Sequence, residues 1–128
     1  MQIILRLFFL LCSAGVYAVP GDVIFSDDFE RTNLGGNWAA SSGSNAGISN
    51  ATANSQSRSL FLRWDTVTVD TPVFDMTGKN GATLSFWWRR GDDSFSEDPD
   101  GNEDLTVQIL LNNTTWVELE RFDGSGTP

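Results

Sequence analysis

The densest group of chemically active side chains is the acidic segment 92–104, which carries seven carboxylates among thirteen residues and no base. Such a concentration of like charge repels itself, so the segment is either fully solvated or neutralised by a cation. Asp98, Asp100 and Asp104 place oxygen ligands at short spacing, which suits Ca²⁺. Gly101 between them permits a sharp turn of the backbone around an ion. The EF-hand is excluded because its twelve-residue ligand pattern is absent.

Other chemistries are limited by what the chain lacks. The sequence has no histidine and a single cysteine, Cys12. This excludes Ser-His-Asp and Cys-His nucleophilic sites and the usual zinc ligand sets.

Glu118 and Glu120 are the one candidate catalytic pair. Two residues apart on a strand, they would share a face at roughly 7 Å, whereas retaining glycosidases place their carboxylates about 5–5.5 Å apart. Alternation with Val117 and Leu119 is also what any half-buried strand shows.

The first 18 residues have the pattern of a secretory signal peptide. Arg6 gives a thin positive start, residues 7–11 begin a short apolar region, and small residues lead up to Ala18. We predict cleavage after Ala18. Lipidation at Cys12 is disfavoured because a leucine precedes it. The pattern predicts a secreted or cell-surface protein whose mature chain does not insert into a membrane.

Removal of the signal peptide leaves 7 basic and 17 acidic side chains, a formal charge of −10. This charge argues against nucleic acid and anionic membrane surfaces as partners. The mature chain would contain no cysteine, so its stability must come from packing or from a metal rather than from disulfides.

The rest of the chain alternates short β-rich runs with Gly, Ser, Asn, Asp and Thr, which indicates an all-β sandwich. The predicted strands cover residues 23–25, 37–40, a short stretch near Ile48, 59–64, 67–74, 82–89, 105–111 and 116–122.

Three details of these strands can be predicted. Pro72 confines its strand to an edge or a bulge. Residues 112–114 form the turn of a hairpin. The period of two also places several apolar side chains on one inward face: Leu84, Phe86, Trp88, Val107 and Ile109.

Several motifs together resemble MAM domains, which are concanavalin-like jelly rolls of secreted and cell-surface adhesion proteins. The motifs are Asp28-Phe29-Glu30, Leu34-Gly35-Gly36-Asn37-Trp38, Ser59-Leu60-Phe61-Leu62, Leu84-Ser85-Phe86-Trp87, Arg90-Gly91 and Asp104-Leu105-Thr106-Val107. The acidic variant is similar to the N-terminal jelly roll of large exported bacterial proteins of the MshQ type, which are tied to a mannose-sensitive haemagglutinin pilus.

The resemblance implies an all-β, concanavalin-like jelly-roll β-sandwich over residues 19–128. It also implies a calcium ion beside the first strand, close to Asp28 and Glu30. With the acidic loop, the candidate ligand set is Asp28, Glu30, Asp98, Asp100 and Asp104. Two departures matter: the disulfide cysteines of animal MAM domains are missing, and so are the closing strands of the family. We therefore expect the domain to be truncated at the C-terminus.

These features predict a non-catalytic, exported adhesion or surface-assembly module that binds a protein or a glycan at a cell surface, with calcium as the expected stabilising ion. Two alternatives stay open. Five tryptophans could provide stacking platforms for sugars in a carbohydrate-binding module. The chain could also be a fragment of a glycosidase with a concanavalin-like fold.

The signal peptide gives the first testable prediction. N-terminal sequencing of exported protein should begin at Val19, because Ala18 ends the small-residue motif that signal peptidase requires. A mature N-terminus at Cys12 would instead establish a lipoprotein and contradict the predicted cleavage.

Overall fold

The computed structural model describes residues 2–10, 23–64, 66–76, 81–91 and 103–124, and for residues 2–10 it describes the backbone. Within these ranges the protein is all-β, as predicted, and has no helix. The same described residues accordingly offer no helix long and apolar enough to cross a membrane.

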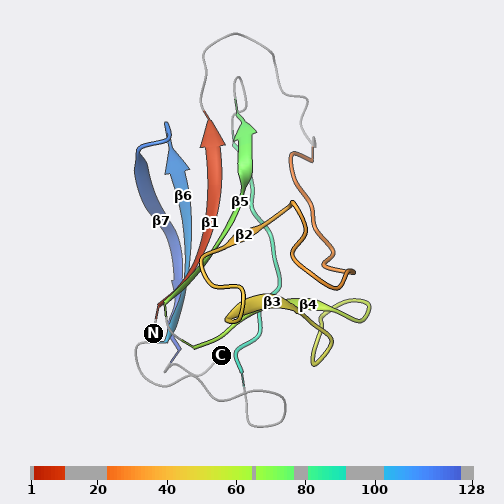
Figure 1. Cartoon of the computed structure of the whole chain (residues 1–128). Coiled ribbons are helices and arrows are strands. Elements are labelled where there is room, and N and C mark those ends of the chain that lie inside the picture. The colour runs from red at the N-terminus through yellow and green to blue at the C-terminus, as the bar shows by residue number, and fades with distance from the viewer. Residues whose placement is uncertain (1, 11–22, 65, 77–80, 92–102, 125–128) are drawn as a thin grey trace.

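Seven strands form two sheets (Figure 1). The five-stranded sheet has the order β2-β5-β1-β6-β7, and β3 pairs with β4 in a separate two-stranded sheet. The strands are β1 (Gln2–Leu10), β2 (Ala39–Ala40), β3 (Ala46–Ser49), β4 (Ser59–Leu62), β5 (Val67–Asp75), β6 (Asp104–Leu111) and β7 (Thr115–Phe122).

The central strand of the larger sheet is β1, which falls within the predicted signal peptide. It runs parallel to β5 on one side and to β6 on the other. Figure 1 shows these three strands side by side and pointing the same way. An apolar run fits this position because a strand paired on both sides in a parallel sheet is typically buried on both faces. Cleavage after Ala18 stays a prediction. If it occurs, the processed chain lacks β1.

The predicted hairpin of β6 and β7 is confirmed. The Thr114 amide donates to the Leu111 carbonyl at 3.0 Å, which closes the turn. Asn112 and Asn113 between them have φ values of 50° and 57°. Two consecutive positive φ values are typical of the type I′ turn, whose twist matches that of the flanking strands, and asparagine tolerates them better than most residues.

The predicted bulge at Pro72 is also confirmed. Arg6 of β1 pairs with Asp70 and Phe8 pairs with Val73, so Thr71 and Pro72 together stand against a single residue of β1. Proline has no amide hydrogen to donate, and the extra residue of a bulge is one that the ladder leaves unpaired.

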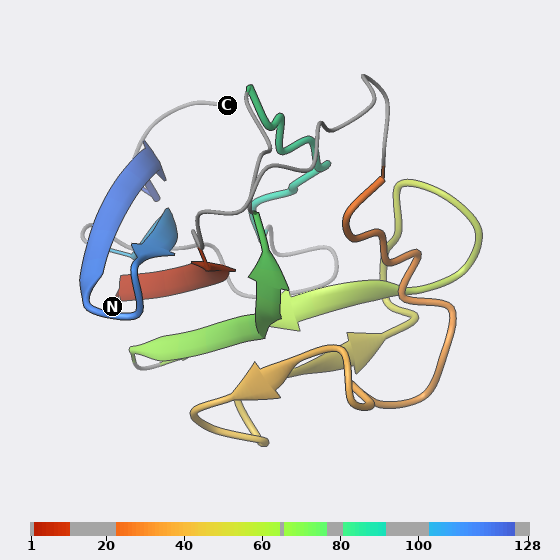
Figure 2. The ribbon, with the colours of Figure 1, turned by 90° about the horizontal axis from the view of Figure 1, so that it is seen from above.

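The core lies on one face of the five-stranded sheet. Val67 and Val69 of β5 are fully buried against Ala46 of β3, with Leu60 and Leu62 of β4 beside them. The smaller sheet therefore covers the β5 side of the larger one, and it runs across it in Figure 1. Figure 2 shows the same strands from above.

A second apolar cluster lies at the β6–β7 end of the same sheet. Val107 of β6 is buried, and Leu105, Ile109 and Phe122 pack against it. Trp38 packs against this cluster and also against the Val67 and Val69 cluster. One tryptophan thus joins the two halves of the core across the position of β1.

Two predicted strands are absent from the described residues. Residues 82–89 and 23–25 form no strand and belong to neither described sheet. High β-propensity favours an extended backbone, but a strand also needs an edge with which to pair. In this structure, β1 takes the sides of β5 and β6 that face each other.

The inward face predicted for residues 84–88 is correct in direction but not in depth. Phe86 and Trp88 both contact the ring of Phe122, at centroid distances of 6.0 and 4.8 Å. Leu84, Phe86 and Trp88 are nevertheless 37–40% exposed, and Trp87, on the opposite side, is 81% exposed. These side chains therefore form the rim of the Val107 cluster rather than its centre.

Two valines of β5 provide a matched test of this core. Val69 is fully buried, whereas Val73 on the same strand is 51% exposed. Val69→Ala should lower the free energy of unfolding by about 2 kcal/mol through lost burial and a residual cavity. Val73→Ala should change it by less than about 0.5 kcal/mol. Equal effects in urea melts would contradict the assigned register of β5.

Candidate functional site

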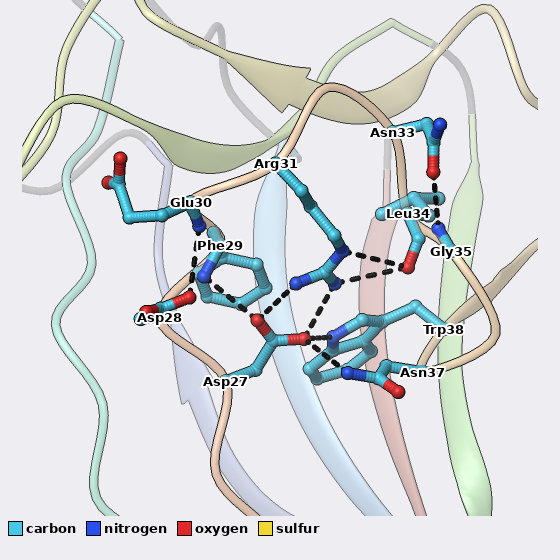
Figure 3. Close-up of polar contacts among 10 residues, drawn as sticks. All are labelled: Asp27, Asp28, Phe29, Glu30, Arg31, Asn33, Leu34, Gly35, Asn37 and Trp38. Atoms are coloured by element: carbon cyan, nitrogen blue, oxygen red, sulfur yellow. Dashed lines mark hydrogen bonds and ion pairs between the residues drawn. The ribbon is translucent and has the colours of Figure 1, made fainter.

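The best-organised polar group in the described residues centres on the Asp27 carboxylate, which is 3% exposed (Figure 3). Arg31 binds it through both terminal nitrogens, and the Nη2–Oδ2 distance is 2.6 Å. The Trp38 indole N–H donates to Oδ2 at 2.7 Å, and the Phe29 amide donates to Oδ1 at 2.8 Å. Asn37 adds a longer contact of 3.4 Å. The carboxylate therefore has donors on both oxygens.

Local turns bring these donors together. Asp27 accepts from the amide two residues on, which is the hydrogen bond of an Asx turn, and Phe29 has a φ of 60°. A positive φ is costly for a bulky residue, and the Asx turn helps to hold it. Arg31 also donates from Nε and Nη2 to the Leu34 carbonyl, at 3.2 and 3.0 Å. Gly35, at a φ of 62°, then reverses the chain toward Trp38.

The environment of Asp27 lowers its pKa. Burial alone would raise it, but hydrogen bonds from Arg31, the Phe29 amide, Trp38 and Asn37 together outweigh burial and lower the pKa of Asp27 to about 2. The carboxylate is therefore ionised at any physiological pH. Its negative charge is compensated inside the protein by the Arg31 guanidinium.

This polar group orients the aromatic core. The ring of Trp38, fixed at one end by Asp27, lies 5.4 Å from the Phe25 ring in an edge-on arrangement and 5.8 Å from the Phe29 ring. Phe25 in turn contacts Phe74 of β5 at 5.1 Å. The 25–38 segment is thus attached to the sheet through an aromatic cluster whose orientation depends on one carboxylate.

Glu30 connects this segment to the turn that precedes β4. Its Oε1 accepts from the backbone amides of Ser57 and Arg58 at 3.0 and 2.8 Å, and its Oε2 accepts from the Ser57 hydroxyl at 2.8 Å. The hydroxyl and amide of Ser57, with Arg58, lower the pKa of Glu30. Asp28 is exposed, and its Oδ1 accepts from the Glu30 amide at 3.0 Å.

Asp104 opens β6 and belongs to a different group. Its Oδ2 pairs with Arg121 of β7 at 3.0 Å, and its Oδ1 accepts from the Gly124 amide at 3.2 Å. Arg121 also pairs with Glu118 at 2.6 Å, and these carboxylates raise the pKa of Arg121. Position 124 requires glycine because an added Cβ would overlap the Glu103 carbonyl.

The structure describes only three of the five predicted calcium ligands. Asp28, Glu30 and Asp104 are described, whereas Asp98 and Asp100 lie outside the described residues. No group of three or more acidic, histidine or cysteine side chains that could hold a metal occurs in the described part of the chain. The protein itself supplies the donors to Glu30 and Asp104, and the calcium site stays a prediction.

Glu118 and Glu120 do not keep the spacing of a regular strand. Glu118 pairs with Gln108 and Glu120 pairs with Val107, so the register shifts between these two adjacent residues of β6. The intervening Leu119 is the extra residue of a bulge. Adjacent residues of a strand project from opposite faces, so the two glutamates are paired with residues on opposite faces of β6. Alternation predicts that Val117 and Leu119 face inward, but they are 36% and 49% exposed because β7 is an edge strand with little packed over it.

The sequence analysis did not identify Asp27. Its partners lie four, ten and eleven residues further along the chain, and only the arginine spacing was visible locally. An acidic residue followed by a basic one four positions later, close to a tryptophan, would have been a usable indication of a buried pair.

Comparisons with known proteins give this chain no relative: no family model matches it, and neither does any curated protein or solved structure.

Two adjacent aspartates give a matched test of the polar group. Asp27→Asn should destabilise the fold by about 2–3 kcal/mol, because it leaves Arg31 without its counter-charge. Asp28→Asn should change the stability by less than about 0.5 kcal/mol, since Asp28 is exposed and an amide oxygen can still accept from Glu30. Equal unfolding free energies for the two variants would contradict the central role of Asp27.

The same pair should differ in pH dependence. The pKa of Asp27 is lowered on folding, so its stabilisation is fully present above an unfolded-state pKa of about 4 and is lost as pH falls toward about 2. Between these values the native protein should lose about 2 kcal/mol of stability through Asp27. Asp27→Asn should remove that part of the pH dependence, and Asp28→Asn should retain it.

Proposed function

We propose that this protein is an exported, non-catalytic adhesion or surface-assembly module with a MAM-like, concanavalin-type jelly-roll domain. The observation that carries the proposal is an exposed apolar ridge formed by residues 84–88. Trp87 on one side of this segment is 81% exposed, and Leu84, Phe86 and Trp88 on the other side keep more than a third of their surface in solvent.

The position of this ridge suits recognition of another macromolecule. Its inner side rests on Phe122 through Phe86 and Trp88, so its base is held in place by the core. Exposed aromatic side chains on a supported base resemble the anchor residues that contribute most of the binding energy of protein interfaces. Exposed apolar side chains that gather in one segment are a feature of interaction sites on proteins.

Export and charge support the same function. The predicted signal peptide would direct the chain to the cell surface. A mature charge of −10 keeps such a module soluble and directs it away from nucleic acid and anionic lipid. Outside the predicted signal peptide, the β3–β4 sheet packs on Val67 and Val69 of β5, as the layers of a β-sandwich do.

A carbohydrate-binding module is the second candidate, and exposed tryptophans favour it. Trp64 is 54% exposed at the turn after β4, with a φ of 53°. The Arg63 guanidinium stacks over its ring at 4.3 Å and over the Phe61 ring at 4.9 Å. A positive φ at a tryptophan is an unusual backbone state that suits a functional position. Sugars stack on flat rings held in this way.

Trp87 and Trp64 separate these candidates. Trp87→Ala should reduce the fraction of exported protein retained on washed cells at least about tenfold, as expected for loss of an interface anchor. Trp64→Ala should leave retention unchanged. Both variants should melt within a few degrees of the parent protein. Binding on a glycan array that is lost with Trp64→Ala would favour the carbohydrate module instead.

Calcium binding is tested on the full chain. Ca²⁺ at one hundred times its dissociation constant should stabilise the fold by about 2.7 kcal/mol if it binds only the native state. Mg²⁺ should do less because it requires tighter octahedral geometry. A double variant, Asp98→Asn with Asp100→Asn, should lose the effect, and Glu120→Gln should keep it. Calorimetry that shows no heat of Ca²⁺ binding to folded protein would contradict the site.

A further inference from the structure

We propose that Arg63 and Trp64 form a binding site for a saccharide that carries a carboxylate. The guanidinium of Arg63 binds the carboxylate, and the indole ring of Trp64 supports the sugar. Both residues follow directly after β4 and belong to no part of the ridge at residues 84–88. This inference rests on the second candidate function, sugar binding at Trp64, and names the chemical class of the sugar.

The Arg63 side chain is held in place by contacts on several sides. Its guanidinium carbon lies 4.9 Å from the centroid of the Phe61 ring and 4.3 Å from that of the Trp64 ring. Its Nη2 donates to the Ser44 carbonyl at 3.2 Å, and its backbone amide donates to the Asn45 carbonyl at 2.9 Å. An arginine restrained in this way loses little further side-chain freedom when it binds a ligand.

The two-stranded sheet determines where these rings lie. Phe61 of β4 is paired with Gly47 of β3, and an added Cβ at Gly47 would lie 3.0 Å from Cε1 of the Phe61 ring. Glycine therefore lets this ring approach the backbone of β3 closely. Trp64, at a φ of 53°, then turns the chain after β4, and its ring contacts the guanidinium. The stack of ring, guanidinium and ring is thus built on the sheet.

Arg63 carries a positive charge that no described acid neutralises. Arg31 and Arg121 both pair with carboxylates. Within the described part of the chain Arg63 forms no ion pair, and the one hydrogen bond from its guanidinium goes to a backbone carbonyl. A guanidinium that stacks on rings still offers the N–H groups at its edge, in a fork that matches the two oxygens of a carboxylate.

The surroundings of this guanidinium favour a saccharide as the bearer of the carboxylate. Trp64 is 54% exposed, so a large part of its ring surface is open to a ligand. Ser44 is exposed too, and its hydroxyl lies 3.1 Å from the side-chain oxygen of Asn45. An aromatic face supports the C–H groups of a sugar ring, and hydroxyl and amide groups bind its hydroxyls.

The charge of the whole chain limits how densely charged the ligand is. A mature charge of −10 repels polyanions, and one arginine pairs with one carboxylate at a time. A saccharide with a single carboxylate on a sugar unit, such as a uronic or a sialic acid, therefore suits the site better than a densely sulfated chain.

Matched probes test the site on the full chain. An oligogalacturonate and sialyllactose are each compared, by titration calorimetry, with their own methyl esters, which keep the sugar and remove the charge. At least one acidic probe should bind at least about tenfold more tightly than its ester, because only the acid pairs with Arg63. Added salt should reduce this difference, since the guanidinium is exposed.

Variants assign the two roles. Arg63→Gln should abolish the at least about tenfold preference for the acid and leave binding of the ester unchanged. Arg63→Lys should recover only part of the preference, because an ammonium has no fork. Arg58→Gln, at the other end of β4, makes the same change in net charge as Arg63→Gln and should keep the preference. Trp64→Ala should weaken acid and ester alike, and Trp64→Phe should restore part of the loss.

Several outcomes would overturn the inference. Asp65 lies outside the described residues, and binding seen only with Asp65→Asn would show that this carboxylate occupies Arg63. Tighter binding of heparin than of either acidic probe would show that the ligand is a densely charged chain. Equal binding of acid and ester would remove the carboxylate but keep sugar binding at Trp64. A glycan array on which folded protein binds no sugar would overturn the second candidate function as well.

Discussion

The hydrogen bond from the Trp38 indole to the buried Asp27 carboxylate is the interaction on which most of the described packing depends. A buried charge is costly unless it is paired and fully hydrogen-bonded, and Arg31 and the Phe29 amide meet that requirement. The fixed tryptophan then lies against both apolar clusters of the larger sheet. A polar contact at the end of one loop therefore determines how the two halves of the core meet.

The strand order imposes a second constraint, which acts through the backbone. In the described sheet β1 lies between β5 and β6, which do not pair with each other, so that sheet is continuous only through β1. A segment that leads a chain through export must be apolar and short, and a central strand of a parallel sheet must be apolar too. One sequence can satisfy both requirements, and for that reason composition alone could not distinguish them in residues 2–10.

Elements whose pairing partner is close in sequence were predictable, and those that depend on distant partners were not. The β6–β7 hairpin follows from alternation and two turn asparagines, and the bulge in β5 follows from Pro72. Residues 82–89 also have a high β-propensity, but they pair with neither described sheet, and propensity does not determine pairing. For the candidate site, the Asp-Phe-Glu motif drew attention to Glu30 in the sequence. The role of Asp27 depends on Trp38, which only the folded loop brings near.

The distribution of basic residues relates the structural carboxylates to the acidic loop. After the signal peptide only 7 bases stand against 17 acids. Arg31 pairs with Asp27 within one loop, and Arg121 pairs with Asp104 between β7 and β6. Glu30 is served by backbone amides and a hydroxyl instead. Segment 92–104 contains seven acids and no base of its own. Its compensation must come from solvent, from a cation or from residues elsewhere, and of these only a cation would also shape the loop around a centre.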